Sequence, residues 1–425
     1  MAVQVQGKYR DLWAFLRQPL QRRRRIRRAS SAFLAPDSLL RLTTELHPKR
    51  LELTITEVRQ EIQIARTFKL VPAGIDAEGR LQRLPPFRAG QYLSVELVVQ
   101  GARVSRPYSI CCSPTEARQG NFYELTVRFR EEGFVAPHIW EQWRPGTRVA
   151  SCGPLGQFGY EPLRDRRDLV FLAGGCGITP FRSLWRELRA DHPEISCTIL
   201  YGATGPEEFI FRQELESLAA ELPHRFQVYF VAAEPDPGWR GLTGFLTGEL
   251  IHELVGNPAD KTFYVCGPPG LYRFLQKELE PFELPPGTLR QEACGETEEV
   301  SAHPGYPGVS ADRVFTAKVH RGSSIYSIPA RASESVLIAL ERAGLAPPAQ
   351  CRSGQCGYCR SLILDGRVYV LPGNDGRRRA DRKFGYFHPC SSYPLTDLEI
   401  RVPADPLSPA GEQGVSKAQQ RRPSW

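Results

Sequence analysis

The nine residues CRSGQCGYC, 351–359, place three cysteines in the spacing C-x4-C-x2-C, and a fourth follows at Cys390 in FHPCSSYP. Four thiolates suit either a zinc ion or an iron–sulfur cluster. Structural zinc sites usually use two C-x2-C pairs, and this chain has one such pair here. The x4/x2 spacing with a distant fourth cysteine is typical of a plant-type [2Fe–2S] cluster. We therefore predict a [2Fe–2S] cluster, with zinc or structural cysteines as the alternatives, on the ligands Cys351, Cys356, Cys359 and Cys390.

The residues around these cysteines form a compact unit, 314–403. Gly354 and Gly357 allow the backbone to wrap closely, so that amide N–H groups point at the sulfurs. The unit resembles the plant-type ferredoxins through IPARASESVLIALERAGL before the cysteines and HPCSSYPLTDLEIRVP after them. The resemblance implies an α+β fold of the β-grasp kind, whose cluster carries one electron at a time.

Length and composition indicate a multi-domain protein without disulfides. The chain has 425 residues, of which 41% are hydrophobic and 24% charged, as in ordinary globular proteins. There is no apolar run of about 20 residues, the length of a membrane span, and no secretory signal. Eleven cysteines without an export signal favour cofactor ligation or buried thiols. We therefore predict a cytoplasmic protein.

The net charge of +8 belongs to an N-terminal extension, residues 1–50, which holds twelve Lys/Arg and three Asp/Glu. Its centre reads LWAFLRQPLQRRRRIRRAS, where apolar residues lie beside six arginines. Pro19 is expected to interrupt any single helix. The extension is either a solvated, partly disordered arm or a docking arm for an anionic membrane surface or an acidic partner. Nucleic-acid binding is not expected, because the rest of the chain shows no basic surface that also carries aromatic residues.

The pattern of expected strands and helices changes near residue 162. Short alternating stretches such as LELTITEV and QYLSVELVV, separated by Gly/Pro-rich turns, predict an antiparallel β-barrel over 51–162. Apolar strands such as DLVFLAGG and TFYVCGPP then alternate with helical segments and predict a doubly wound α/β domain over 163–293. A Gly-, Pro- and Ser-rich stretch, 294–313, is interpreted as a linker, and 404–425 as a disordered tail.

Two short stretches could bind a flavin and a nucleotide. In RPYSI, placed just after a predicted barrel strand, Arg106 could meet the phosphates and Tyr108 and Ser109 the flavin ring. In LAGGCGITPF, glycines end a strand and Pro180 opens a helix, which suits a pyrophosphate. The spacing of these glycines is not G-x-G-x-x-G. Taken alone, RPYSI also suits an ordinary strand edge, and the glycine stretch also suits a tight turn.

Together these stretches resemble the ferredoxin–NADP reductase superfamily over residues 51–293. The resemblance implies that RPYSI binds flavin, that GGCGITP binds the nicotinamide nucleotide, and that YVCGPPGL lies beside the nicotinamide. The residues implied in catalysis are Tyr108, Ser109 and Cys266. The residues implied in cofactor binding are Arg106, Pro107, Tyr108, Ser109, Gly133, Phe134, Val135, Ala136, Gly174, Gly175, Gly177, Thr179, Pro180, Cys266, Gly267 and Pro268.

Two departures from the family pattern bear on the cofactors. The family's Gly-Gly-x-x-Ser flavin-phosphate loop is EGFVA here, Glu132 to Ala136, which lacks the hydroxyl but keeps backbone N–H groups. The prediction is FAD rather than FMN. After YGA, Thr204 and Gly205 stand where NADPH users often have an arginine, which favours NADH over NADPH.

The implied function is that of an NAD(P)H:acceptor oxidoreductase, as in oxygenase reductase components. A hydride passes from NADH to FAD, and single electrons then pass to [2Fe–2S] and on to an external redox protein, an oxygenase or other metalloenzyme. Two alternatives are a non-catalytic electron-transfer subunit of a larger complex and a redox-sensing adaptor recruited by the basic arm. Cys111, Cys112, Cys152, Cys176 and Cys197 are interpreted as small buried residues.

Overall fold

A computed structural model describes residues 8–28, 50–75, 82–292, 300–303, 305–371, 373 and 375–403. The chain forms two compact units, Met1–Leu46 and His47–Trp425. The predicted tail, 404–425, lies outside the described residues. Within the described ranges, no helix combines the length and the apolar character that crossing a membrane requires.

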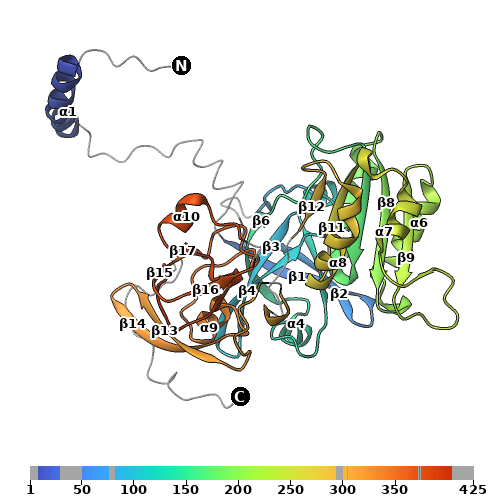
Figure 1. Ribbon diagram of the computed structural model, residues 1–425. Helices are drawn as coiled ribbons and strands as arrows, with labels where there is room; N and C mark the ends of the chain where they lie inside the picture. Colours follow the sequence, from blue (N-terminus) through green and yellow to red (C-terminus); the bar gives the residue numbers. More distant parts are fainter. Residues whose placement is uncertain are drawn as a thin grey trace. The chain divides into compact units, whose positions relative to one another are not determined.

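The described residues of the first unit form the helix α1 (Lys8–Arg28), which runs through Pro19 (Figure 1). The expectation that Pro19 would interrupt the helix was therefore wrong. Proline removes one backbone donor from a helix and crowds the preceding turn. Here the residues after Pro19 are mostly leucine, glutamine and arginine. These residues favour a helix, because their straight side chains lose little rotamer freedom in it.

The second unit begins with a six-stranded antiparallel sheet in the order β4-β3-β6-β1-β2-β5. An antiparallel bridge between Ile110 and Leu125 joins the two ends of this order, which confirms the predicted barrel. The RPYS residues were predicted to follow a strand. In the structure they are instead the last four residues of β4. The elements are β1 (Leu51–Ile62), β2 (Ala65–Pro72), β3 (Tyr92–Val99), β4 (Ala102–Ser109), α3 (Pro114–Gly120), β5 (Tyr123–Arg128), α4 (Ala136–Gln142) and β6 (Arg148–Leu155).

A parallel six-stranded sheet follows, in the order β10-β9-β8-β7-β11-β12, and confirms the predicted doubly wound domain. The first strand, β7, lies between β8 and β11, so the chain winds away from it in both directions. The elements are β7 (Asp168–Gly174), α5 (Ile178–Asp191), β8 (Ser196–Ala203), α6 (Arg212–Glu221), β9 (Phe226–Ala232), β10 (Leu242–Thr243), α7 (Gly248–Val255), β11 (Lys261–Cys266), α8 (Pro269–Leu279) and β12 (Leu289–Gln291).

Alternate residues of β7 bury opposite faces of this sheet, as the two-residue period of a strand requires. Leu169 and Phe171 pack in one apolar cluster with residues of α5 and α6. Val170 and Leu172 pack in a second cluster with residues of α7 and α8. Both faces are therefore covered, which explains why β7 is an almost continuous apolar run.

The third domain is a mixed five-stranded sheet in the order β14-β13-β19-β15-β17, with β16 and β18 paired beside it. Only β13 and β19 are parallel in the larger sheet. This α+β arrangement confirms the predicted ferredoxin-like fold. The elements are β13 (Val314–Arg321), β14 (Ser324–Arg331), α9 (Val336–Arg342), β15 (Ser361–Asp365), β16 (Val368–Val370), α10 (Arg379–Lys383), β17 (Tyr386–Phe387), β18 (Ser392–Pro394) and β19 (Leu398–Arg401).

The predicted linker, 294–313, is described from residue 300 onward, apart from residue 304. Residues 300–302 form a short 3-10 turn. Val300 is only 2% exposed and packs with Leu371, Tyr393 and Tyr306. Val300 and Tyr306 therefore anchor this segment to the ferredoxin domain, while most of the described residues between 307 and 313 are exposed.

A buried arginine joins the barrel to the parallel sheet. Arg182 of α5 contacts Glu124 of β5 at 2.7 Å and Glu214 of α6 at 2.8 Å, with 5% of its side chain exposed. Burial alone would raise the pKa of Glu214, but Arg182 and Arg186 outweigh it and hold that pKa below its ordinary value. The ionised Glu214 therefore stabilises the folded state fully when the pH is above the ordinary pKa of a glutamate. This stabilisation is lost as the pH falls through the lowered pKa of Glu214.

Replacing Arg182 with methionine should lower the stability strongly, because Glu124 stays buried but loses its partner at 2.7 Å. Its contact with Arg59 remains and is longer, at 3.4 Å. The expected loss is about 3 kcal/mol in the free energy of unfolding, measured by urea denaturation. Arg189→Met is the matched control on the same helix, since Arg189 and Glu221 form an exposed pair worth less than about 1 kcal/mol. Equal losses in the two variants would contradict the importance of the buried pair.

Candidate functional site

A cavity of about 930 Å³ lies between the barrel and the carboxyl ends of the parallel strands. Its walls come from the end of β4, from β5, and from the loops after β7, β8 and β11. Ligands of open parallel sheets bind at this kind of place, outside the carboxyl ends of the strands. The predicted site residues that line it are Pro107, Tyr108, Ser109, Gly174, Gly175, Gly177, Thr179, Cys266, Gly267 and Pro268.

The barrel side of the cavity is formed by the end of β4. Tyr108 is half-buried and packs against the barrel core. Burial raises the pKa of its phenol well above the ordinary value, so the hydroxyl stays protonated at neutral pH. An aromatic ring with Ser109 beside it is a suitable wall for a flat, redox-active ring such as a flavin.

The remaining predicted flavin residues do not line this cavity. Arg106 lies near Glu341 of α9, at 3.7 Å. In the stretch 133–136, the Val135 side chain is buried in the barrel core and Phe134 is 41% exposed. A phosphate beside this stretch would therefore meet backbone amides, as the missing serine hydroxyl already indicated.

The sheet side of the cavity is the predicted nucleotide loop. Gly175 has a φ of +51°, a backbone conformation that favours glycine. A Cβ added at Gly177 would lie 2.1 Å from the carbonyl oxygen of Cys266. A short 3-10 turn, Gly175–Gly177, leads into α5, which begins without a side-chain cap. The positive end of the helix dipole at this point favours a negatively charged group. Pro180 is buried within the first turn of α5.

Cys266 ends β11 at the floor of the cavity, and Glu292 lies behind it. The Cys266 thiol is 3% exposed and donates to Glu292 Oε2 at 3.7 Å. Tyr272 joins the two segments, because its hydroxyl accepts from the amide of Gly267 at 3.2 Å and donates to the carbonyl of Glu292. The sequence analysis missed Glu292, and its position directly after β12, the strand paired with β11, is the signal that identifies it.

Two arginines add positive charge to the cavity wall. Arg128, at the end of β5, forms an ion pair with Glu208 at 2.8 Å, and Arg130 also lines the cavity. A Cβ added at Gly175 would lie 2.9 Å from Arg128 Nη1, which places this guanidinium beside the nucleotide loop. Arginines suit phosphate oxygens through paired hydrogen bonds. Sequence analysis did not select them, because YELTVRFR has the pattern of an ordinary strand.

The four predicted cluster ligands come together at the other end of the unit. Cys351, Cys359 and Cys390 are buried, and Cys356 is exposed. The sulfurs of Cys359 and Cys390 lie 3.4 Å apart. Backbone N–H groups point at three of the sulfurs, from Gly354 to Cys390 at 3.3 Å, from Cys356 to Cys351 at 3.4 Å and from Tyr358 to Cys356 at 3.4 Å.

Two polar atoms beside these cysteines further match a sulfide-containing cluster. The hydroxyl of Ser353 and Nε2 of His388 are buried and have no hydrogen-bond partner among the described residues. His388 is held from its other side, since Nδ1 lies 2.6 Å from the carbonyl oxygen of Gly354. Buried polar groups normally have a partner, and inorganic sulfide would supply acceptors here. The four sulfurs, the converging amides and these two atoms therefore fit a [2Fe–2S] cluster.

The cysteines outside the cluster differ in their surroundings. Cys111, Cys112 and Cys197 are buried, as predicted. Cys152 is half-buried, and Cys176 is exposed and lines the cavity. The prediction that Cys176 is buried was wrong, because the residue lies in the turn Gly175–Gly177 between β7 and α5, which forms part of the cavity wall. The residue at position 294 lies outside the described part of the chain.

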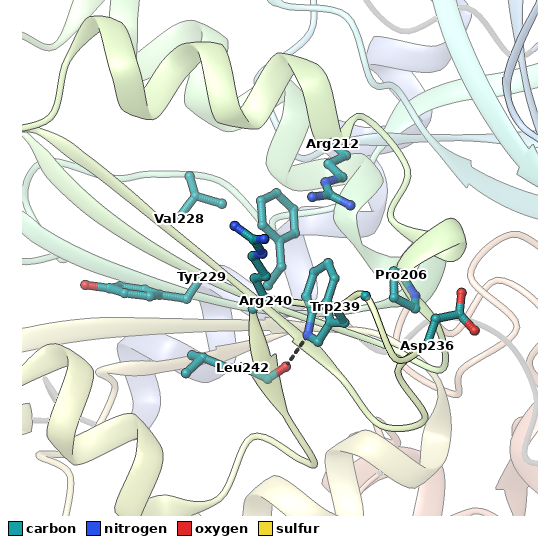
Figure 2. Close-up of a pocket in the computed structure, with 11 residues that line it drawn as sticks. Pro206, Arg212, Val228, Tyr229, Asp236, Trp239, Arg240 and Leu242 are labelled. Atoms are coloured by element: carbon teal, nitrogen blue, oxygen red, sulfur yellow. Dashed lines mark hydrogen bonds between the residues drawn. The ribbon is translucent and has the colours of Figure 1, made fainter.

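A second hollow, of about 670 Å³, lies along β9 and the 236–242 loop (Figure 2). The Trp239 indole donates to the carbonyl of Leu242 at 2.9 Å, and the Arg212 guanidinium lies over its ring at 5.2 Å. The same guanidinium lies 5.7 Å from the ring of Phe230. These contacts hold the loop against the sheet edge. None of the predicted site residues lines this hollow.

Three protein families match successive parts of the chain. Residues 62–160 match the oxidoreductase FAD-binding domain, residues 171–277 the oxidoreductase NAD-binding domain, and residues 320–395 the 2Fe-2S iron-sulfur cluster binding domain. The matched ranges contain the RPYS strand, the nucleotide loop and the four cluster cysteines respectively.

Several characterised proteins are similar over most of their length. The glycine betaine monooxygenase reductase subunit of Chromohalobacter salexigens is 26% identical over 74% of this chain and 87% of its own. The ferredoxin reductase component of the Mycobacterium tuberculosis 3-ketosteroid-9-alpha-monooxygenase is 27% identical over 82% and 94%. NADH-cytochrome b5 reductase 1 of Laccaria bicolor is 33% identical over 52% and 70%.

A solved structure superposes on most of this chain. Phthalate dioxygenase reductase, a modular structure for electron transfer from pyridine nucleotides to [2Fe–2S], superposes with a TM-score of 0.58 at 25% identity. The superposition covers 83% of this chain and 98% of that one.

Gly177→Ala should disturb the nucleotide loop, because the new Cβ would overlap the Cys266 carbonyl and push apart the loops after β7 and β11. Reduction of an artificial acceptor by NADH should fall more than about tenfold, the effect of roughly 1.4 kcal/mol in binding or alignment. Gly238→Ala is the matched control, since a Cβ there meets no atom within 4 Å. Steady-state rates that match in both variants would contradict this tight packing.

Proposed function

The chain belongs to the ferredoxin–NADP reductase superfamily and carries a C-terminal 2Fe–2S ferredoxin domain, and we propose that it passes electrons from NADH to an oxygenase. It is an oxidoreductase in which electrons pass from NAD(P)H through FAD to the [2Fe–2S] cluster. When bound, FAD takes a hydride from reduced nicotinamide and releases single electrons that the cluster can accept.

The observation that carries the proposal is the shared cavity between the RPYS strand and the nucleotide loop. Tyr108 and Ser109 provide the wall for the flavin ring, and Gly175 and Gly177 allow a pyrophosphate to approach the start of α5. The pairing of β11 with β12 brings Cys266 and Glu292 together, and we assign this pair to the nicotinamide end. The residues bind and align two flat rings, which is the main requirement for hydride transfer.

The nucleotide preference rests on Glu234, at the carboxyl end of β9. Its backbone amide donates to the carbonyl of Thr204 at 2.8 Å, so Glu234 adjoins Thr204 and Ala233, which line the cavity. A carboxylate beside the adenosine ribose accepts from a 2′-hydroxyl and repels a 2′-phosphate. Both effects favour NADH over NADPH.

The proposed acceptor follows from the named relatives. Two of them are reductase parts of monooxygenases, and the superposed structure is the reductase of a dioxygenase. An oxygenase consumes electrons singly at a metal centre, and a one-electron cluster at the end of the path suits this demand.

Cys390→Ser should separate the two stages of the path. The variant should lose the cluster and with it the reduction of cytochrome c, while NADH should still reduce ferricyanide through the flavin. Cys197→Ala is the control, because Cys197 is buried in the parallel-sheet core far from the cluster ligands in the fold. Loss of both activities in Cys390→Ser, in protein that keeps its flavin, would contradict the proposed order.

The same assay measures the nucleotide preference in the unmodified protein. NADH should have a KM about tenfold lower than NADPH, corresponding to roughly 1.4 kcal/mol. Equal KM values would argue against the role given to Glu234.

Helix α1 supports a second contact, with an anionic membrane surface. Tyr9, Leu12, Trp13 and Leu16 follow the spacing of one helical face and are between 54% and 83% exposed. Six exposed arginines follow between positions 22 and 28. Aromatic and aliphatic side chains beside clustered arginines are typical of helices that lie in the headgroup region of anionic bilayers.

The full-length protein should sediment with phosphatidylglycerol vesicles and not with phosphatidylcholine vesicles, and raised salt should weaken this binding. Leu16→Ala should weaken it, whereas Leu163→Ala, at a residue that is 98% exposed in the second unit, should not. Binding to neither vesicle, or equal binding to both, would contradict the membrane contact and leave an acidic protein as the partner to seek.

A further inference from the structure

A buried carboxylate, Glu341, connects the cluster loop to the helix before it. Glu341 lies in the last turn of α9, and 6% of its side chain is exposed. Arg352, the residue after the ligand Cys351, donates to both of its carboxylate oxygens, with Nη2 at 3.0 Å from Oε2. Arg352 is 1% exposed and has a φ of +55°, so the surroundings hold it in an unfavourable backbone conformation.

The same carboxylate faces the flavin strand. Arg106 Nη1 lies 3.7 Å from Glu341 Oε2 and donates to the carbonyl of Ser105 at 2.8 Å. Helix α9 and strand β4 are neighbours in the structure (Figure 1). One buried negative charge is therefore shared by two guanidinium groups, one from the cluster loop and one from the RPYS residues.

Hydrogen bonds fix the chain on the other side of Cys351 to the same barrel strands. Ser105 Oγ donates to the carbonyl of Ala349 at 2.9 Å, and Ser94 Oγ lies 3.5 Å from the same oxygen. Gln350 Nε2 lies 3.7 Å from the sulfur of Cys152, on β6. The residues before the first cluster ligand therefore contact strands of the flavin-binding barrel directly. Arg352, after that ligand, is connected to the barrel through Glu341.

The charges at this contact are unequal. Two arginines, Arg106 and Arg352, face the one carboxylate of Glu341. Burying Glu341 is costly unless it is paired, and Arg352 provides that pair within the ferredoxin domain. The attraction to Arg106 is then additional, and it depends on the domain being docked against β4.

We propose that Glu341 is a positioning residue that holds the cluster loop against the RPYS strand, so that electron transfer from flavin to cluster depends on it. The inference rests on the proposed function, since it assigns a residue to the second stage of that path. Electron input from NADH takes place at the opposite wall of the cavity, formed by Cys266 and the nucleotide loop, and does not require Glu341.

The test is Glu341→Gln, which keeps the size of the side chain and removes its charge. Reduction of ferricyanide by NADH should stay unchanged, and reduction of cytochrome c should fall about fivefold, a typical coupling between two sites. X-ray scattering of the flavin- and cluster-loaded protein should show a larger radius of gyration. Glu334→Gln is the matched control, because Glu334 pairs with Arg342 inside the ferredoxin domain.

A variant outside the ferredoxin domain covers the case in which Glu341→Gln fails to assemble its cluster. Ser105→Asp places a carboxylate opposite the Ala349 carbonyl, so that two acceptors face each other. It should show the same loss of cytochrome c reduction and the same increase in radius of gyration, with the cluster absorbance unchanged.

Normal cytochrome c reduction and scattering in Ser105→Asp, or in a cluster-containing Glu341→Gln, would overturn the positioning role. Failure of the proposed function is recognised separately, since the unmodified protein would then not reduce ferricyanide with NADH.

Discussion

Strand β4 is the element on which the two stages of the electron path depend. Its last residues, Tyr108 and Ser109, line the cavity that we assign to the flavin and nicotinamide. Ser105 contacts Ala349, close to the first cluster ligand, and Arg106 contacts Glu341 of α9. A strand rises about 3.3 Å per residue, so these two sets of contacts are separated by roughly 10 Å along one rigid element. Pairing of β4 with β3 over its whole length keeps this spacing fixed.

The two other domains are held to the barrel in different ways. The parallel sheet is joined by the buried charges of Arg182, Glu124 and Glu214, and by the hydroxyl of Ser183, which donates to the carbonyl of Cys112 at 2.7 Å. Such contacts fix the width of the cavity, and hydride transfer needs that width to be constant. The ferredoxin domain is joined by longer and fewer polar contacts, around Glu341 and Ala349. A contact of this kind suits a domain that must also meet an external acceptor.

Much of this architecture could be predicted because each domain has a local signature. The C-x4-C-x2-C spacing identifies the cluster loop, and the alternation of apolar and polar residues identifies the barrel strands. The glycines at the end of the DLVFLAG strand identify the nucleotide loop. The exact place of RPYS within β4 was missed, since a proline and an arginine lower the strand propensity of its last residues. Pro19 was overvalued as a helix breaker, because the residues around it favour a helix.

The residues that sequence reasoning missed act through contacts between distant segments. Glu292 meets Cys266 only because β12 pairs with β11, and Arg128 reaches the nucleotide loop only because β5 adjoins the parallel sheet. Glu341 lies in a helix with an ordinary amphipathic pattern, and its two arginine partners are 11 and 235 residues away. Spacing along the chain carries no information on such pairs, whereas the cluster ligands are recognisable from their spacing alone.

The central claim is that electrons enter at the cavity beside β4 and pass through FAD to the cluster. The most direct test is rapid mixing of the anaerobic, cofactor-loaded protein with NADH while the flavin and iron–sulfur absorbance bands are followed separately. The account predicts that the flavin band bleaches first and that the cluster band follows. A cluster band that bleaches without the flavin, or bands that NADH leaves unchanged, would contradict it.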